Sequence, residues 1–159
     1  MTEGRPVRDE TESPHPIPDS RRPASPGTRP IPAGWPRGSG YSHAVSAEGR
    51  TLFLSGQIGW NPITERVVEG GMAAQARQAF MNIVALLAAG GAEPTHLVRL
   101  TWFVTGREAY LRERRAIGAA YREIFGRHYP AMSVVVVSTL LEPGAEIEIE
   151  ATAVVPPNA

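Results

Sequence analysis

Three glutamates alternate with apolar residues near the C-terminus, and they are the side chains best suited to acid–base chemistry. Positions i, i+2 and i+4 of a strand share one face, so Glu146, Glu148 and Glu150 are expected on the same side of a sheet. A carboxylate there can take a proton from water and return it to a leaving group. From spacing alone, the polar face of an amphipathic strand is the simpler interpretation.

The composition excludes several other chemistries. All 16 of the Lys and Arg residues are Arg, and Cys is absent. The chain can therefore form neither a lysine Schiff base nor a thiolate nucleophile, and it has no disulfide or Cys-based zinc site. His43, His96 and His128 lack metal-ligand spacing. We predict that the protein uses no metal and no cofactor.

Charge and hydropathy indicate the compartment and the partners. The formal net charge is +0, with 16 acidic residues against 16 Arg, so no electrostatic footprint for nucleic acid is present. No apolar run approaches the roughly 18 residues that span a bilayer, and no apolar signal-peptide core stands at the N-terminus. We predict a cytoplasmic protein that binds neither nucleic acid nor membranes.

The first 37 residues differ in composition from the rest. Residues 1–37 hold 9 of the 15 prolines among polar and charged residues. Such a segment cannot bury enough apolar surface to offset the entropy of ordering it. We predict a disordered, Pro-rich N-terminal tail over 1–37, with Ile31 and Trp35 as possible anchors, and one folded domain over 38–159.

Hydrophobic periodicity within 38–159 predicts an α+β fold. The expected strands cover residues 41–45, 51–58, 96–104, 133–137 and 146–155. The expected helices run from residue 72 to the glycines at 90 and 91, and from 108 to 125. This order, β-β-α-β-α-β-β, predicts a sheet with both helices packed on one face.

Two segments give further expectations. The valines of 133–137 do not alternate with polar residues, so that strand is expected to be buried on both faces. The Arg-rich run at 112–115 is expected on the solvated face of its helix. An acidic strand beside a Val-rich neighbour suggests that the open sheet face takes part in self-association.

Several short motifs occur in one order along the chain. They are LSGQI at 54–58 with Asn61-Pro62, AQARQ at 74–78 with Asn82, and IEIEA at 147–151. Together, over residues 41–155, they resemble the RidA family of reactive intermediate deaminases, also called YjgF or L-PSP. The resemblance implies a chorismate-mutase-like α+β fold and a homotrimer around a central barrel, with small-molecule clefts between subunits.

The same resemblance implies an activity. Many family members hydrolyse enamines and imines to a 2-keto acid and ammonia without a metal or cofactor. Tyr41 matches the family's cleft tyrosine, Ser55 and Gly56 its strand-edge pair, and Glu148 the acid that positions or activates water. Gly118 stands where the family has a cleft asparagine.

One departure from the family pattern concerns substrate binding. Deaminase members carry an Arg that binds the substrate carboxylate, but here the segment Tyr129-Pro130-Ala131-Met132-Ser133 has Met132 at that position. A thioether is a weak acceptor with no donor, whereas guanidinium offers five donors. The loss is expected to cost about 1.5–3 kcal/mol of carboxylate binding. His128 could supply a positive charge instead.

The implied substrate-binding residues are thus Tyr41, Ser55, Gly56, Gly118, Tyr129, Ala131 and Met132. With Tyr129 and Trp60, Met132 could form an apolar pocket for an aromatic ligand. We predict a deaminase-like hydrolase acting on a labile imine or enamine other than the common 2-imino acids. The alternative is a trimer that binds a small ligand or a partner without turnover. Ribonuclease activity is disfavoured, because no basic stripe with interleaved aromatics is present.

The tail hypothesis gives a first testable prediction. Deleting residues 1–30 should leave the melting temperature nearly unchanged, because few stabilising contacts are expected there. Thermal melts of the full-length and shortened chains, followed by circular dichroism, would measure the difference. A large drop would show that the deleted segment docks on the domain, through Ile17.

Overall fold

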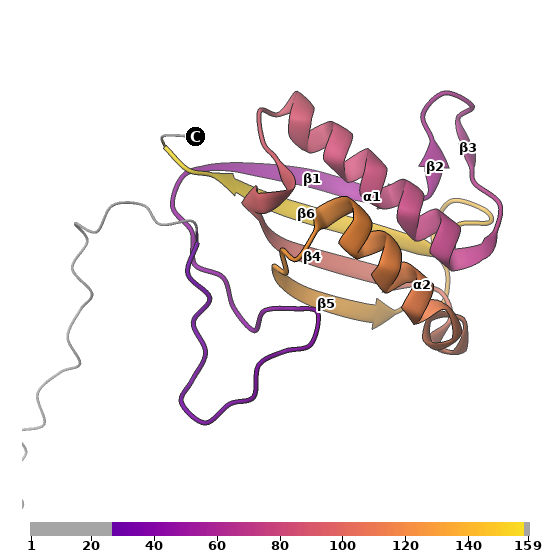
Figure 1. Cartoon of the computed structure of the whole chain (residues 1–159). Coiled ribbons are helices and arrows are strands. Elements are labelled where there is room, and N and C mark those ends of the chain that lie inside the picture. The colour runs from indigo at the N-terminus through magenta and orange to yellow at the C-terminus, as the bar shows by residue number, and fades with distance from the viewer. Residues whose placement is uncertain (1–26, 158–159) are drawn as a thin grey trace, which may run out of the picture.

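The sheet of this protein has four strands and is covered by two helices on one face. The computed structural model describes residues 27–157. The sheet order is β1-β6-β4-β5, from strands Arg50–Ile58, Ile147–Val155, Leu97–Val104 and Ala131–Val136. Helices α1 (Gly71–Ala89) and α2 (Arg107–Phe125) both lie on one face of it, in front of the sheet in Figure 1. The α+β fold predicted from the periodicity is confirmed.

Strand β6 is central and pairs antiparallel with both β1 and β4, while β5 pairs parallel with β4 at the edge. The parallel pair requires a crossover connection, and α2 supplies it. A short ribbon, β2 (Trp60–Asn61) with β3 (Arg66–Val67), precedes α1. A 3₁₀ turn, η1 (Pro94–His96), leads into β4. No helix within residues 27–157 is long and apolar enough to cross a membrane.

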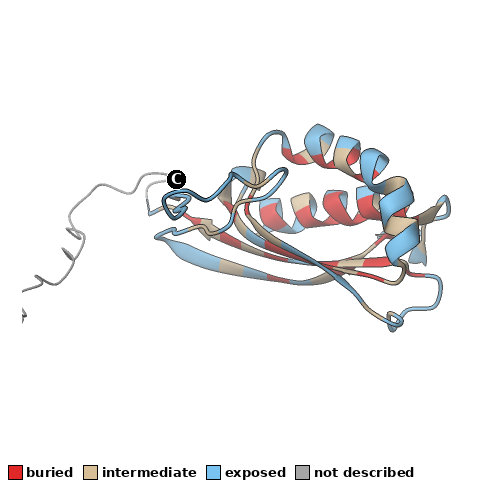
Figure 2. Cartoon of the chain, turned by 90° about the horizontal axis from the view of Figure 1, so that it is seen from below, coloured by how far each residue is buried: buried red, intermediate tan, exposed pale blue. Residues whose placement is uncertain are grey.

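The core lies between the helices and the sheet, where the buried residues gather in Figure 2. Phe80 of α1 is its centre, with ring centroids 5.4 Å from Trp102, 5.6 Å from Tyr121 and 5.2 Å from Phe125. These rings meet at the tilted and edge-to-face angles that aromatic pairs prefer. The aromatic cluster therefore joins α1, β4 and α2.

Contacts between the helices fix their relative position. The Glu113 carboxylate of α2 accepts a hydrogen bond of 2.8 Å from the backbone N–H of Ala73, in the first turn of α1. It thereby satisfies one of the N–H groups that have no partner inside the helix. Arg77 of α1 donates from Nη1 to Glu123 of α2 at 2.6 Å. Glycines 90 and 91 end α1, as the sequence predicts.

The predicted strand at 41–45 is wrong. The described part of this region forms only isolated bridges, between Thr28 and Ser46 and between Ser42 and Ala131. Ser42 donates its backbone N–H to Pro130 at 2.9 Å and its hydroxyl to the Tyr129 carbonyl at 2.6 Å. The segment is thus held by hydrogen bonds to the two residues that precede β5, and it does not form a strand ladder.

The expectation that 133–137 is buried on both faces is also wrong for the single chain. Strand β5 is the sheet edge, paired only with β4. Val134, Val135 and Val136 are 40%, 43% and 52% exposed. A β-branched run predicts a strand that needs cover, but it cannot tell whether the same chain supplies that cover.

Most of the predicted tail, residues 1–26 with Ile17, lies outside the described residues. Within 27–37, Ile31 and Trp35 are exposed, and the Trp35 ring meets the His43 ring edge-on at 5.5 Å. The boundary at residue 38 stays a prediction.

The aromatic cluster gives a stability prediction. Phe80→Ala should lower the free energy of unfolding by about 3–5 kcal/mol, because it removes a fully buried ring and leaves a cavity. Urea titration followed by circular dichroism would measure it. Met81→Ala, at a 44% exposed position of the same helix, is the control and should change stability by less than about 1 kcal/mol. Equal effects would contradict this placement of the core.

Candidate functional site

Glu148 lies on the open face of the sheet, opposite the helices. Its neighbours Ile147 and Ile149 are fully buried under the helices, so strand alternation turns Glu148 the other way. It stands between Phe103 of β4 and Ile58 of β1, its register partners, and is partly buried. The carboxyl group is therefore held among strands and can still reach a ligand on this face.

Gly56 makes room for that carboxyl group. A Cβ atom at Gly56 would lie 1.8 Å from Glu148 Oε1, so any side chain would displace the carboxylate. The β1–β6 register shifts between Leu54 and Gln57, so Ser55 and Gly56 have no partner residue on β6. Such bulges redirect side chains and leave backbone groups unpaired. Glu148 thus lies against the stretch of β1 where the ladder with β6 is interrupted.

Gln57 supports the bulge, and our sequence analysis did not single it out. It is buried, and its amide Nε2 lies 3.3 Å from the Ser55 carbonyl, the Ser55 hydroxyl and the Gly56 carbonyl. A polar residue that occupies an inward position of an apolar strand was the available signal. Because buried polar groups need partners, Gln57 stabilises this local conformation.

Met132 and Gly118 lie on the other side of the sheet. Met132 pairs with the buried Leu100 of β4 and packs against the core. With Gly118, Tyr129, Trp102, Arg114 and Arg122 it lines a cavity of about 400 Å³ between α2 and β5, which we call the helix-side cavity. The expectation of an apolar pocket around Met132 and Tyr129 is met in part, since Trp60 lines neither this cavity nor the next.

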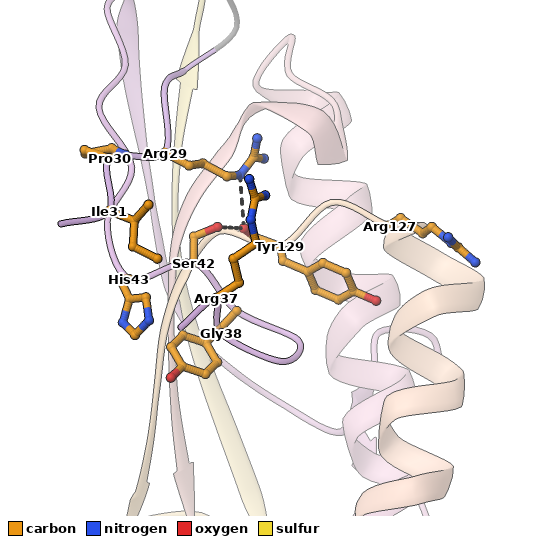
Figure 3. A pocket seen from close by; sticks show the side chains of 10 residues that line it. Arg29, Pro30, Ile31, Arg37, Gly38, Ser42, His43, Arg127 and Tyr129 are labelled. Atoms are coloured by element: carbon orange, nitrogen blue, oxygen red, sulfur yellow. Dashed lines mark hydrogen bonds between the residues drawn. The ribbon is translucent and has the colours of Figure 1, made fainter. Parts of the chain in front are cut away.

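A second cavity, of about 340 Å³, contains Tyr41. Figure 3 shows it from close by; its lining also includes Arg29, Arg37, Ser42 and Tyr129. Tyr129 belongs to both cavities, and its ring points toward α2 (Figure 3), where it stacks on Tyr121 with centroids 5.6 Å apart. The two cavities therefore adjoin at this residue.

The buried titratable groups near these cavities act as structural groups. Burial raises the pKa of Tyr121, whose hydroxyl donates to the His128 carbonyl at 2.7 Å. Burial also lowers the pKa of His128, which favours the neutral ring. Its Nε2 donates to the Leu97 carbonyl at 2.7 Å, and its Nδ1 accepts from Arg29 at 3.1 Å. His128 does not line the helix-side cavity, so it does not supply the positive charge that was expected of it beside Met132.

The expected site residues thus fall in three places. Ser55, Gly56 and Glu148 are together on the open face. Gly118, Met132 and Tyr129 are together in the helix-side cavity, and Tyr41 is in the adjoining one.

Ala131 of β5 pairs with Arg99 of β4 and forms a bridge to Ser42, which lines the cavity that contains Tyr41. Because the sheet separates Glu148 from Met132, one chain does not bring them into one cleft. Within residues 27–157 no group of three His, Asp or Glu side chains could hold a metal ion.

Known proteins similar to this chain agree with the fold and motifs. Protein DfrA of Myxococcus xanthus is 39% identical over 119 residues, covering 72% of this chain and 84% of its own. The human 2-iminobutanoate/2-iminopropanoate deaminase is 35% identical over 114 residues, covering 72% of this chain and 79% of its own.

A solved structure is also similar. The Rid-family protein YyfB of Yersinia pestis, whose function is unknown, aligns with a TM-score of 0.65 at 36% identity, covering 73% of this chain and 87% of that one. The model of the family described as Endoribonuclease L-PSP matches residues 36–155. This chain therefore belongs to the L-PSP family, the family of the RidA and YjgF proteins.

Proposed function

We propose that this protein is a cofactor-independent hydrolase of imines or enamines, with Glu148 as its catalytic residue. The observation that carries the proposal is the Glu148 carboxyl group held over Gly56 at the bulge of β1. The relatives named 2-iminobutanoate/2-iminopropanoate deaminases act on C=N bonds of this kind, as their names state.

The chemistry requires one group that moves a proton in two directions. Glu148 takes a proton from water as the water oxygen bonds to the imine carbon, and the C=N π electrons pass to nitrogen, which is protonated. Glu148 then takes the hydroxyl proton of the carbinolamine and passes it to the amine, so that the C–N bond breaks, ammonia leaves and a carbonyl product forms. General acid–base catalysis by a positioned carboxyl group contributes typically 10²–10⁴-fold to such steps.

A complete cleft needs two copies of the chain. Glu148 and the helix-side cavity lie on opposite faces of one sheet, so they meet only if the open face of one subunit packs against the β5 edge of another. Phe53 on the open face is 79% exposed, and Val135 and Val136 of β5 are 43% and 52% exposed. Exposed apolar surface of this kind marks association sites. We propose a homotrimer, as the family resemblance implies.

Met132 determines which substrates are excluded. It offers no donor to a carboxylate, and it packs against Leu100 and the core where the deaminases are expected to present a guanidinium. The substrate is therefore an imine or enamine other than the common small 2-imino acids. The same observation supports the second candidate, a trimer that binds a small ligand without turnover.

Exchange of Met132 tests the proposal. The wild-type protein should hydrolyse 2-iminopropanoate slowly, and Met132→Arg should raise kcat/KM at least about tenfold by restoring a charge-assisted contact. Adding Glu148→Ala should remove this gain. Ammonia release from freshly generated imine would be followed, with circular dichroism spectra of each variant as the folding control. Wild-type turnover as fast as that of the human relative would contradict the assigned role of Met132.

The assembly gives a separate prediction. Light scattering at micromolar concentration should report about three times the 17.1 kDa of the chain. Phe53→Glu, which places a charge on the open face, should shift the mass toward 17.1 kDa and lower turnover together, because each cleft uses two copies. A monomeric wild-type protein with a cooperative thermal melt would overturn the shared-cleft arrangement.

A further inference from the structure

One row of side chains on α2 faces the helix-side cavity. Tyr110, Arg114, Gly118 and Arg122 recur at intervals of four residues, the spacing that places side chains above one another on a helix. All four line the cavity, opposite Met132 of β5. Gly118 stands between the two arginines, and a Cβ atom there would lie 3.5 Å from Arg122 Nη1. The guanidinium of Arg122 therefore already reaches over the space that Gly118 leaves.

The two arginines of this row have no acidic partner in residues 27–157. Other arginines of the helices do: Arg77 pairs with Glu123, and Arg112 with Glu113. The cavity lining contains no Asp or Glu. Burial raises the pKa of the Tyr110 hydroxyl, and the positive charge of Arg114 opposes this rise. The cavity thus has a positive rim with no counter-charge from the described chain.

Trp102 gives an independent indication of a ligand. Its side chain is 4% exposed and lines the same cavity. Its indole Nε1 is the one buried side-chain polar atom within residues 27–157 that has no hydrogen-bond partner. Native structures leave few such groups unsatisfied, and each calls for an explanation. A ligand acceptor that reaches Nε1 when the side chains covering it move aside would provide one.

The remaining walls are aromatic or apolar. Tyr129 stacks on Tyr121 at an interplanar angle of 9°, and Met132 and Ile117 add apolar surface beside Ser39 and Gly40. Methionine is a flexible, polarisable side chain that adapts to aromatic rings. The volume of about 400 Å³ falls in the range of small-molecule sites.

We propose that the helix-side cavity binds an aromatic carboxylic acid, with the carboxylate between Arg114 and Arg122, the ring against Tyr129 and Met132, and an acceptor oxygen at Trp102 Nε1. This deepens the proposed function and rests on it only for turnover: the substrate class becomes aromatic 2-imino acids or their enamines. The cation that binds the carboxylate comes from α2, while Met132 contacts the ring.

Calorimetric titration of the full-length protein with three compounds tests this inference. Phenylpyruvate carries both groups, pyruvate lacks the ring, and phenylacetone lacks the carboxylate. Phenylpyruvate should bind at least about tenfold more tightly than either of the others, since a charge-assisted contact and a buried ring each contribute that much. Equal affinity for phenylpyruvate and phenylacetone would show a site without anion recognition and overturn the proposal.

Substitutions on α2 locate the site. Arg114→Gln and Arg122→Gln should each weaken phenylpyruvate binding about tenfold or more. Arg115→Gln is the matched control, because Arg115 is exposed on the same helix and lines no cavity described above. Equal loss in all three variants would indicate a general charge effect and overturn the assignment to this cavity.

Two further measurements separate binding from folding. Gly118→Ala should raise the melting temperature, because Ala favours a helix interior over Gly. It should also weaken phenylpyruvate binding, because the added methyl group fills space between Arg114 and Arg122 that the carboxylate needs. The indole N–H resonance of Trp102, assigned with Trp102→Phe, should shift when phenylpyruvate is added.

An unchanged resonance at saturation would remove Trp102 from the site and overturn this part of the inference. The titrations involve no turnover. Absence of imine hydrolysis alongside tight phenylpyruvate binding would therefore contradict the proposed function alone.

Discussion

The alternation of side chains along the central strand β6 determines which face of the sheet carries the core and which face carries Glu148. Ile147 and Ile149 are fully buried under the helices, which forces Glu148 to the opposite face. A slip of one residue would bury the glutamates and expose the isoleucines, so the register is strongly specified. The same rule applied to β5 places Met132 beside Leu100 on the helix face. Glu148, the proposed catalytic residue, and Met132, the proposed substrate contact, are thereby divided between two faces of one sheet.

Two glycines leave space at the two places, Gly56 beside Glu148 and Gly118 in the helix-side cavity, and they do so in different ways. At Gly56 a Cβ atom would overlap the Glu148 carboxyl group at 1.8 Å, so packing itself demands glycine. At Gly118 the nearest atom would be 3.5 Å away, an ordinary contact, and glycine costs roughly 1 kcal/mol relative to alanine in a helix interior. Packing does not explain Gly118. In the proposed binding mode, Gly118 leaves space for the ligand carboxylate between Arg114 and Arg122.

The parts that the sequence predicted are those with a strong local signal. Both helices and strand β6 follow from long periodic patterns, and Gly56 and Glu148 follow from the family resemblance. The strand at 41–45 was wrong because Ser42 is tied to Tyr129 and Pro130 by contacts far away in sequence. The valines of β5 signalled burial without revealing that the strand is an edge.

The two arginines of the helix-side cavity were missed for a similar reason. The run at 112–115 looks like solvated helix surface, and most of it is. Only the fold places Arg114 and Arg122 opposite β5, in one cavity with the buried Trp102. Sequence spacing puts the four residues of the row on one side of α2, but it cannot identify what that side faces.

A site that binds a carboxylate through arginines of α2 selects a different kind of ligand from a site whose arginine stands on β5. An arginine on β5 would be held by a strand on a rigid sheet, whereas Arg114 and Arg122 are exposed side chains that lose rotamer freedom when they bind. Charge alone then contributes less net affinity. The apolar walls and the directional Trp102 N–H must contribute the rest.

A small 2-imino acid would occupy only the charged end of a cavity of about 400 Å³, whereas an aromatic one would also cover Tyr129 and Met132. Under the proposed binding mode, Met132 therefore fits a change of substrate class better than a loss of binding.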